Sequence, residues 1–309
     1  MKVVFMGTPE FAVYSLKALL TQHEVLAVVT QPDKPRGRGK KLVPTPVKAY
    51  ALEQGLKVYQ PEKVNDPAFV SLLEELNPEV IAVTAFGQIL PEGILNIPKY
   101  GCINVHGSLL PKYRGAAPMQ WSIMEGETVT GITTMFMAKG MDTGDMLLKT
   151  EVEITPEDTF ASVHDKMAEA GAVLLLDTLA AMQAGTVERV PQNHEAATYA
   201  PMITKETGHI DWKKSAEEII NLMRGLDPAP GAYSIYVDTP LKLFRGTKAE
   251  GLYHQGQPGE VVDITKKGFV VKCGDGALTI TELQATGKKR MSADAYLRGH
   301  AIKQGVLLQ

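Results

Sequence analysis

Hydrophobic positions in the first half of the chain form short runs that alternate with helical patterns. Short apolar runs predict strands over 3–6, 24–30, 80–86 and 101–106. Apolar residues at helical spacing predict helices over 11–20, 47–53 and 67–76. The run at 80–86 is nearly all apolar, as in a parallel strand buried on both faces. This alternation predicts a doubly wound, mostly parallel sheet that binds ligands at the carboxyl ends of its strands.

The pattern changes in the second half of the chain. One long amphipathic helix is expected over 160–184, and Ser215 is expected to cap a helix that runs through Met223. Short strands separated by turns are expected over 232–237, 241–245, 259–264, 269–272 and 278–283. Five such strands predict a small barrel. We therefore expect a first domain over 1–189, a linker over 190–208 and a β-barrel domain over 209–309.

Length and composition agree with two domains of a soluble protein. The chain has 309 residues, of which 44% are hydrophobic and 22% charged. No stretch approaches the roughly 20 apolar residues of a membrane span, and the chain becomes a strand and turn too early for a signal peptide. We expect a cytoplasmic protein without a membrane partner. Cys102 and Cys273 lie in different expected domains, which argues against a disulfide framework or a cysteine metal site.

The start of the chain provides a test for dinucleotide binding. Residues 7–11 follow the first strand but lack the Gly-x-Gly-x-x-Gly spacing that lets the backbone approach a pyrophosphate. Thr8 is expected to cap the first helix, with Pro9 at its first position. A nicotinamide cofactor is therefore not expected.

Asn104 and His106 stand at the end of a strand, where they can project together into one cleft. Residues two apart in a strand face the same side, so the amide and the imidazole would offer a hydrogen-bond donor beside a titrating group. A carboxylate from the turn at 141–145 would orient the imidazole, and both Asp142 and Asp145 are available there. This combination favours acyl transfer.

The segment 33–44 carries five basic residues against one acid, Asp33. Its glycines and prolines predict a loop without regular structure. Residues 1–189 are acidic overall, with 17 basic and 22 acidic residues, so the loop would be a local site for phosphate groups. Solvated surface charge explains the loop about equally well. Residues 288–290, Lys-Lys-Arg, are a second candidate for phosphate contact.

Two motifs together resemble a known family. Asn-x-His-x-Ser-Leu-Leu-Pro-x-x-Arg-Gly begins at Asn104, and Gly-Met-Asp-Thr-Gly-Asp begins at Gly140. Both resemble the signature of folate-dependent formyltransferases. The resemblance implies a Rossmann-like formyltransferase domain followed by an oligonucleotide-binding-type (OB-like) barrel, with 10-formyltetrahydrofolate as donor and an amine as acceptor. It implies that Asn104, His106 and Asp142 are catalytic, and it alone selects Asp142 over Asp145. No metal is implied.

The resemblance also places the folate. It implies contacts with the loop after the third strand and with the segment after the catalytic strand, at Phe86, Gln88, Ile89, Leu90, Leu109, Leu110, Pro111 and Lys112. The residues themselves indicate only a plausible pocket wall, in which backbone polar groups lie beside apolar side chains.

Within this family, a basic loop after the second strand is typical of enzymes that formylate initiator methionyl-tRNA for translation initiation. The resemblance therefore implies tRNA contacts by Arg36, Arg38, Lys40 and Lys41. A formyltransferase acting on a nucleotide sugar or on glycinamide ribonucleotide would share the catalytic residues, as would a formyltetrahydrofolate hydrolase. A catalytically silent RNA-binding module would not need them. We expect a monomer, although no motif reports the oligomeric state.

Overall fold

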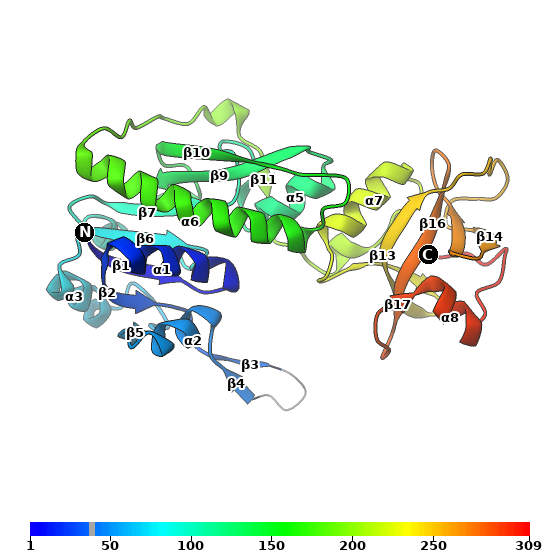
Figure 1. Ribbon diagram of the computed structural model, residues 1–309, viewed down its shortest axis with the longest axis horizontal. Helices are drawn as coiled ribbons and strands as arrows, with labels where there is room; N and C mark the ends of the chain where they lie inside the picture. The colour runs from blue at the N-terminus through cyan, green and yellow to red at the C-terminus, as the bar shows by residue number, and fades with distance from the viewer. Residues whose placement is uncertain (37–40) are drawn as a thin grey trace. The chain divides into compact units, whose positions relative to one another are not determined.

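The computed structural model describes residues 1–36 and 41–309 (Figure 1). These residues form two compact units, and two short segments that precede residue 164 belong to the second unit. The first unit comprises Met1–Pro118, Val129–Glu153 and His164–Ala200. The second comprises Met119–Thr128, Ile154–Val163 and Pro201–Gln309.

A seven-stranded sheet forms the centre of the first unit, in the order β10-β9-β7-β6-β1-β2-β5. Its strands are β1 (Lys2–Gly7), β2 (Glu24–Val29), β5 (Val58–Tyr59), β6 (Val80–Thr84), β7 (Cys102–His106), β9 (Val129–Phe136) and β10 (Met146–Glu153). The five neighbouring strands β7, β6, β1, β2 and β5 pair in parallel. Strand β9 is antiparallel to both of its neighbours, β7 and β10. The predicted mostly parallel sheet is confirmed, and the four expected strands are β1, β2, β6 and β7.

Helices cover both faces of this sheet (Figure 1). They are α1 (Glu10–Gln22), α2 (Pro46–Glu53), α3 (Pro67–Leu76), α4 (Glu92–Leu95) and α6 (Phe160–Ala184). On one face, α3 and α4 pack on an apolar cluster that includes Met6, Val83 and Cys102. On the other face, Ser15 of α1 accepts a hydrogen bond from Thr84 of β6. Gly171 lets α6 approach Val105 of β7, which a Cβ atom would contact at 3.2 Å.

Within residues 1–36 and 41–309, one helix is long and apolar enough to cross a membrane, and this helix is α6. Its apolar residues have a different use in the fold. Val163, Met167, Leu175 and Leu179 are all fully buried. Burial in the core of the protein therefore accounts for the apolar composition of this helix.

The first turn differs from the expectation in one detail. The N-cap of α1 is Pro9, and no side chain caps the helix. The expected cap by Thr8 is wrong, because its hydroxyl donates to the carbonyl oxygen of Phe86 at 2.8 Å. Thr8 thus ties the first turn to the loop that follows β6.

The basic segment has more regular structure than its composition suggested. Strands β3 (Lys34–Arg36) and β4 (Lys41–Val43) pair as an antiparallel ribbon, in which Arg36 pairs with Lys41. The expected absence of regular structure is therefore wrong. A two-stranded ribbon tolerates Pro35 because each strand has a free edge, where a missing backbone N–H costs nothing.

A second, antiparallel sheet dominates the second unit, in the order β12-β13-β16-β15-β14, with β17 paired to β16. Its strands are β12 (Ala232–Tyr236), β13 (Thr239–Lys248), β14 (Val261–Thr265), β15 (Gly268–Lys272), β16 (Ala277–Ala285) and β17 (Met291–Ser292). Helical segments of this unit are α5 (Pro118–Met124), η2 (Glu206–Gly208), α7 (Ala216–Gly225) and α8 (Ala293–Gly299). All five expected strands are present, and Ser215 caps α7 in a capping box with Glu218.

The last residues of the chain connect the two edges of this second sheet. Gln309 exchanges backbone hydrogen bonds with Ile235 of β12. At the other edge, the N–H of Val261 in β14 donates to the carbonyl of Val306, and the N–H of Leu308 donates to Gly259. The C-terminal segment thereby closes the sheet in the manner of a barrel, which protects both edge strands. The predicted α/β domain followed by a barrel-like β domain is confirmed.

Candidate active site

Asn104 and His106 lie on the face of the first sheet that carries α3 and α4. Cys102, two residues before Asn104, packs in the apolar cluster on that face, and side chains alternate along β7. The neighbouring strand β6 pairs Val83 with Asn104. No residue in the described part of the chain makes a hydrogen bond to the half-buried Asn104 amide. This amide is therefore available to a ligand.

The imidazole of His106 is held at both of its nitrogens. Nε2 lies 2.9 Å from the carbonyl oxygen of Tyr113, and Nδ1 lies 3.6 Å from Oδ2 of Asp142. Because a carbonyl oxygen can only accept, Nε2 must carry a proton and donate it. Nδ1 is then the nitrogen that can take up or release a proton. The ring is buried, so this exchange takes place out of bulk water.

In the turn after β9, the two aspartates of the motif have different partners. Oδ2 of Asp142 accepts a hydrogen bond from the N–H of Gly115 at 2.9 Å, beside His106. Asp145 instead pairs with the guanidinium of Arg189 at 3.0 Å. The structure thus brings Asp142 to the imidazole and gives Asp145 a separate ionic partner.

A strap formed by residues 190–200 lies along the loop that follows β7. β11 (Tyr199–Ala200) pairs in parallel with β8 (Arg114–Gly115). Gly115 has φ +119°, and a Cβ atom there would lie 2.7 Å from the carbonyl oxygen of Ala200, so the strap requires glycine at this position. The strap also contains Gln192, which contacts both Arg114 and the Asp142 turn.

Sequence reasoning missed three residues of this site: Tyr113, Arg114 and Gln192. Tyr113 and Arg114 lie inside the first motif, so their position in the same motif as Asn104 and His106 was a signal that could have identified them. Gln192 lies in a segment that was expected to be a linker, 50 residues from Asp142. No local pattern marks a contact over that distance.

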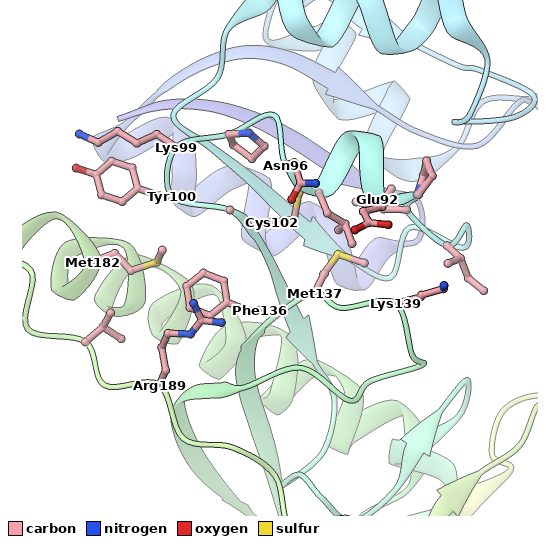
Figure 2. A pocket seen from close by; sticks show the side chains of 17 residues that line it. Glu92, Asn96, Lys99, Tyr100, Cys102, Phe136, Met137, Lys139, Met182 and Arg189 are labelled. Carbon is pink, nitrogen blue, oxygen red and sulfur yellow. The ribbon is translucent and has the colours of Figure 1, made fainter.

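A cavity of about 900 Å³ opens in the first unit at the start of β7, with lining residues from α4 and from the end of α6 (Figure 2). Two of the residues implied for folate, Ile89 and Leu90, line it together with Leu95, Cys102 and Met137. Its lining also includes three cationic side chains and one acid: Lys99, Lys139, Arg189 and Glu92. In Figure 2 the guanidinium of Arg189 lies over the ring of Phe136, 4.3 Å from its centroid. Apolar walls with a cationic rim suit a flat heterocycle that carries an anionic tail.

The other residues implied for folate lie elsewhere. Phe86 is buried in the apolar cluster, and Gln88 accepts a hydrogen bond from the N–H of Val64 at 3.0 Å. Leu110 is buried beside Met135 and Met146. Leu109, Pro111 and Lys112 belong to the loop after β7 and do not line the cavity.

The basic candidates are placed only in part. Arg36 is the last residue of β3, and Lys41 is the first residue of β4. Arg38 and Lys40 lie outside the described residues. Arg290 already has partners within the second unit: it forms ion pairs with Asp227 and Glu282 and stacks on the ring of Phe244. These contacts argue against its proposed role in phosphate binding.

The two cysteines are buried and free, and burial raises the pKa of the Cys102 thiol to about 12. Cys102 fills space beside β7 in the apolar cluster under α3 and α4. Within 1–36 and 41–309, no group of three or more His, Cys, Asp or Glu residues comes together as a metal site would require.

These contacts define a site for proton exchange beside an open hydrogen-bond donor. The Asn104 amide can donate to a developing oxyanion, and a proton taken up at Nδ1 of His106 would lie next to the Asp142 carboxylate. Within 1–36 and 41–309, the partners of the imidazole are the Tyr113 carbonyl and the Asp142 carboxylate, not a hydroxyl or a thiol, so the geometry favours direct attack by a substrate group.

Comparison with known proteins identifies the class. The formyl transferase family profile matches residues 1–179, and the formyl transferase C-terminal domain profile matches residues 202–301. The chain belongs to the formyl transferase family. It is 55% identical to a methionyl-tRNA formyltransferase of Caldanaerobacter subterraneus subsp. tengcongensis, with all of both chains covered. It is 50% identical to the methionyl-tRNA formyltransferase of Acetivibrio thermocellus, covering 100% of this chain and 99% of the relative.

A solved structure shares the fold at lower identity. The N-formyltransferase of Helicobacter canadensis, in complex with folinic acid and dTDP-3-aminofucose, superposes with a TM-score of 0.69 at 22% identity. The match covers 92% of this chain and 99% of that one. The family expected from the two motifs is thus confirmed over nearly the whole chain.

Proposed function

We propose that this protein transfers the formyl group of 10-formyltetrahydrofolate to the α-amine of initiator methionyl-tRNA. The observation that carries the proposal is the His106 ring, held between the Tyr113 carbonyl and the Asp142 carboxylate beside an open Asn104 amide. Full-length relatives that are 50% to 55% identical bear this activity in their names. We expect the protein to act in the cytoplasm as a monomer.

The reaction balances without a metal or a redox step. The neutral amine of methionine attacks the formyl carbon, and a carbon–nitrogen bond forms while the carbonyl oxygen becomes an oxyanion. The bond from the formyl carbon to N10 of the folate then breaks. The proton lost by the amine passes to N10, so the products are N-formylmethionyl-tRNA and tetrahydrofolate.

Three side chains divide this work. Asn104 donates a hydrogen bond to the oxyanion, which is stronger in the transition state than in the ground state. His106 receives the amine proton at Nδ1 and returns it to the leaving nitrogen. Asp142 stabilises the charged imidazolium from 3.6 Å away and keeps the ring in one orientation.

We propose that the folate occupies the cavity of Figure 2. Cys102 lines this cavity, and Asn104 is the next residue on the same face of β7, about 7 Å further along the strand. A pterin ring between Leu90, Leu95 and Met137 would therefore leave the formyl group within reach of Asn104. The cationic rim at Lys99 and Lys139 suits the carboxylates of the glutamyl tail.

The tRNA would contact two regions of the chain. We propose that the basic segment 33–44 neutralises phosphates near the acceptor end through Arg36, Arg38, Lys40 and Lys41. The barrel-like second unit provides a further surface, because residues 190–309 hold 15 basic and 13 acidic residues. In this proposal, residues 1–189 carry out catalysis and residues 209–309 bind tRNA.

The test measures formyl transfer from 10-formyltetrahydrofolate to methionyl-tRNA, with initiator tRNA, elongator tRNA and no tRNA in parallel. We expect transfer to the initiator, weak transfer to the elongator and little formate without tRNA. Formate release without transfer would identify a hydrolase instead. Silence in all three assays would redirect the search to small amine acceptors.

A further inference from the structure

The turn that carries Asp142 has an unusual backbone. Asp142 has φ +51°, in the left-handed region that non-glycine residues seldom adopt. Gly144 lies so close to β9 that a Cβ atom there would overlap the carbonyl oxygen of Phe136. Support from elsewhere in the fold must therefore fix this turn, and with it the position of the carboxylate beside His106.

Gln192 supplies this support from the strap. Its Nε2 lies 2.8 Å from the carbonyl oxygen of Asp142 and 2.8 Å from that of Gly144. One amide group thus donates to two carbonyls of the same turn. The side chain is buried, so water does not compete for these bonds.

Arg114 fixes which way the Gln192 amide points. The Oε1 atom of Gln192 accepts from Nε and Nη2 of Arg114, at 3.1 and 2.6 Å. A guanidinium only donates, so the amide oxygen must face it and the NH2 group must face the turn. Arg114 also donates to Nδ1 of His194 at 3.1 Å.

The Arg114 guanidinium is buried, and no carboxylate of the described residues contacts it. Its residue is 2% exposed, and its partners in the described part of the chain, Gln192 and His194, are neutral amide and imidazole groups. Burial of a cation with such partners is costly for stability alone. The next residue, Gly115, donates its N–H to the Asp142 carboxylate. Arg114 and Gly115 therefore hold Asp142 from two sides, through Gln192 and through the backbone.

We propose that Gln192 is a positioning residue for catalysis: clamped by Arg114, it holds the Asp142 turn so that the carboxylate lies beside His106. The inference rests on the proposed roles of His106 and Asp142. It predicts that loss of the hydrogen bonds from Gln192 to the turn slows formyl transfer. The same loss should leave the binding of folate and tRNA largely unchanged.

Two substitutions separate this role from a purely structural one. Gln192→Met keeps the size of the side chain but removes all its hydrogen bonds. Gln192→Glu keeps the contact with Arg114 as an ion pair but cannot donate to the turn. Gln304→Met is the matched control, because Gln304 also donates its amide to a backbone carbonyl, that of Val262, in the second unit.

We expect both Gln192 variants to lower kcat by about 10- to 100-fold, the effect of displacing a catalytic group by about 1 Å. KM for each substrate should stay within about twofold, and Gln304→Met should match the wild type. If Gln192 only satisfied the buried Arg114, Gln192→Glu would retain wild-type kcat, which would overturn the proposal. A rise in KM without a loss of kcat would overturn it as well.

A second readout needs no substrate. The imidazole ¹⁵N resonances of His106 should shift in Gln192→Glu and stay in place in Gln304→Met, because only the former moves the carboxylate beside the ring. Unchanged His106 resonances in Gln192→Glu would refute the positioning role. A wild-type protein that fails to formylate methionyl-tRNA would refute the proposed function instead, so the two failures are distinguishable.

Discussion

Asp142 lies 3.6 Å from Nδ1 of His106, whereas the opposite edge of the ring donates from Nε2 to the carbonyl of Tyr113. The backbone contact fixes the tautomer, and the carboxylate stands beside the nitrogen that is left to exchange a proton. The surroundings of the ring are thus asymmetric: Nε2 holds its orientation, and Nδ1 is the nitrogen that exchanges a proton in the proposed mechanism. Asp145 has no part in it, since it pairs with Arg189.

This asymmetry gives a matched pair of substitutions. Asp142→Asn removes the charge that stabilises a protonated His106, so we expect kcat to fall by about 10²- to 10⁴-fold, as for loss of proton transfer. Asp145→Asn removes the other negative charge of the motif, which forms an exposed ion pair with Arg189. For this variant kcat should remain near the wild-type value. Steady-state kinetics of both variants decides the assignment. Equal losses would show that the motif acts as a unit.

Asn104→Ala should remove the oxyanion donor. Loss of one such donor costs roughly 10²- to 10³-fold in rate, about 3–4 kcal/mol of transition-state stabilisation. Single-turnover transfer at saturating substrates measures this loss, and folate and tRNA binding should be retained. Asn65→Ala, at an exposed position, is the control. Near-normal turnover in Asn104→Ala would remove the basis of the proposed mechanism.

Met137→Trp should obstruct the cavity of Figure 2, which Met137 lines. If folate binds there, KM for 10-formyltetrahydrofolate should rise by about tenfold or more, equivalent to at least about 1.4 kcal/mol. KM for methionyl-tRNA should be unaffected. Val173→Trp, at an exposed position of α6, controls for the added bulk. An unchanged donor KM would place the folate outside this cavity.

Arg38→Ala should weaken the use of methionyl-tRNA. Each phosphate contact that is lost reduces the dependence of log K on log salt by about one. Transfer measured at several salt concentrations should therefore show a flatter slope, while formate release from the donor is spared. The exposed Lys57→Ala is the control for loss of one positive charge. A parallel loss in both reactions would contradict a role in tRNA binding.

Stability of the second unit should depend on pH through Glu282. Hydrogen bonds from the Arg290 guanidinium hold the pKa of Glu282 below its ordinary value. The pair therefore stabilises the fold fully at pH values above the ordinary glutamate pKa of about 4.3, and the contribution is lost as pH falls through the lower folded value. Glu282→Gln should cost about 1 kcal/mol of unfolding free energy at pH 7.

Urea unfolding at pH 7 and near pH 3 tests this prediction. The difference between wild type and Glu282→Gln should shrink at the lower pH, because the wild-type carboxylate becomes protonated. Glu217→Gln, which breaks an exposed ion pair with Lys248, should match the wild type at both pH values. A difference that stays constant with pH would exclude titration of Glu282 as its cause.

Much of the fold follows from periodicity along the chain. The expected helices over 67–76 and 160–184 coincide with α3 and α6, and all four expected strands of the first unit are present. Strand β9 went unpredicted because Thr133 and Thr134 make its sequence polar. Both are fully buried, and their hydroxyls reach Ser108 and Thr178, far away in sequence. Only tertiary contacts make such a strand stable.

The sequence by itself determined the alternation of strands and helices, the place of Asn104 and His106 at a strand end, and the two motifs of the family. These are local features, set by side-chain polarity and by a spacing of a few residues. The tertiary structure placed Asp142 beside His106 and Asp145 beside Arg189, bonded Thr8 to the loop after β6 in place of the expected helix cap, and brought Gln192 to the Asp142 turn. Each of these depends on hydrogen-bonding groups that lie far apart in the chain and meet only when the fold is complete.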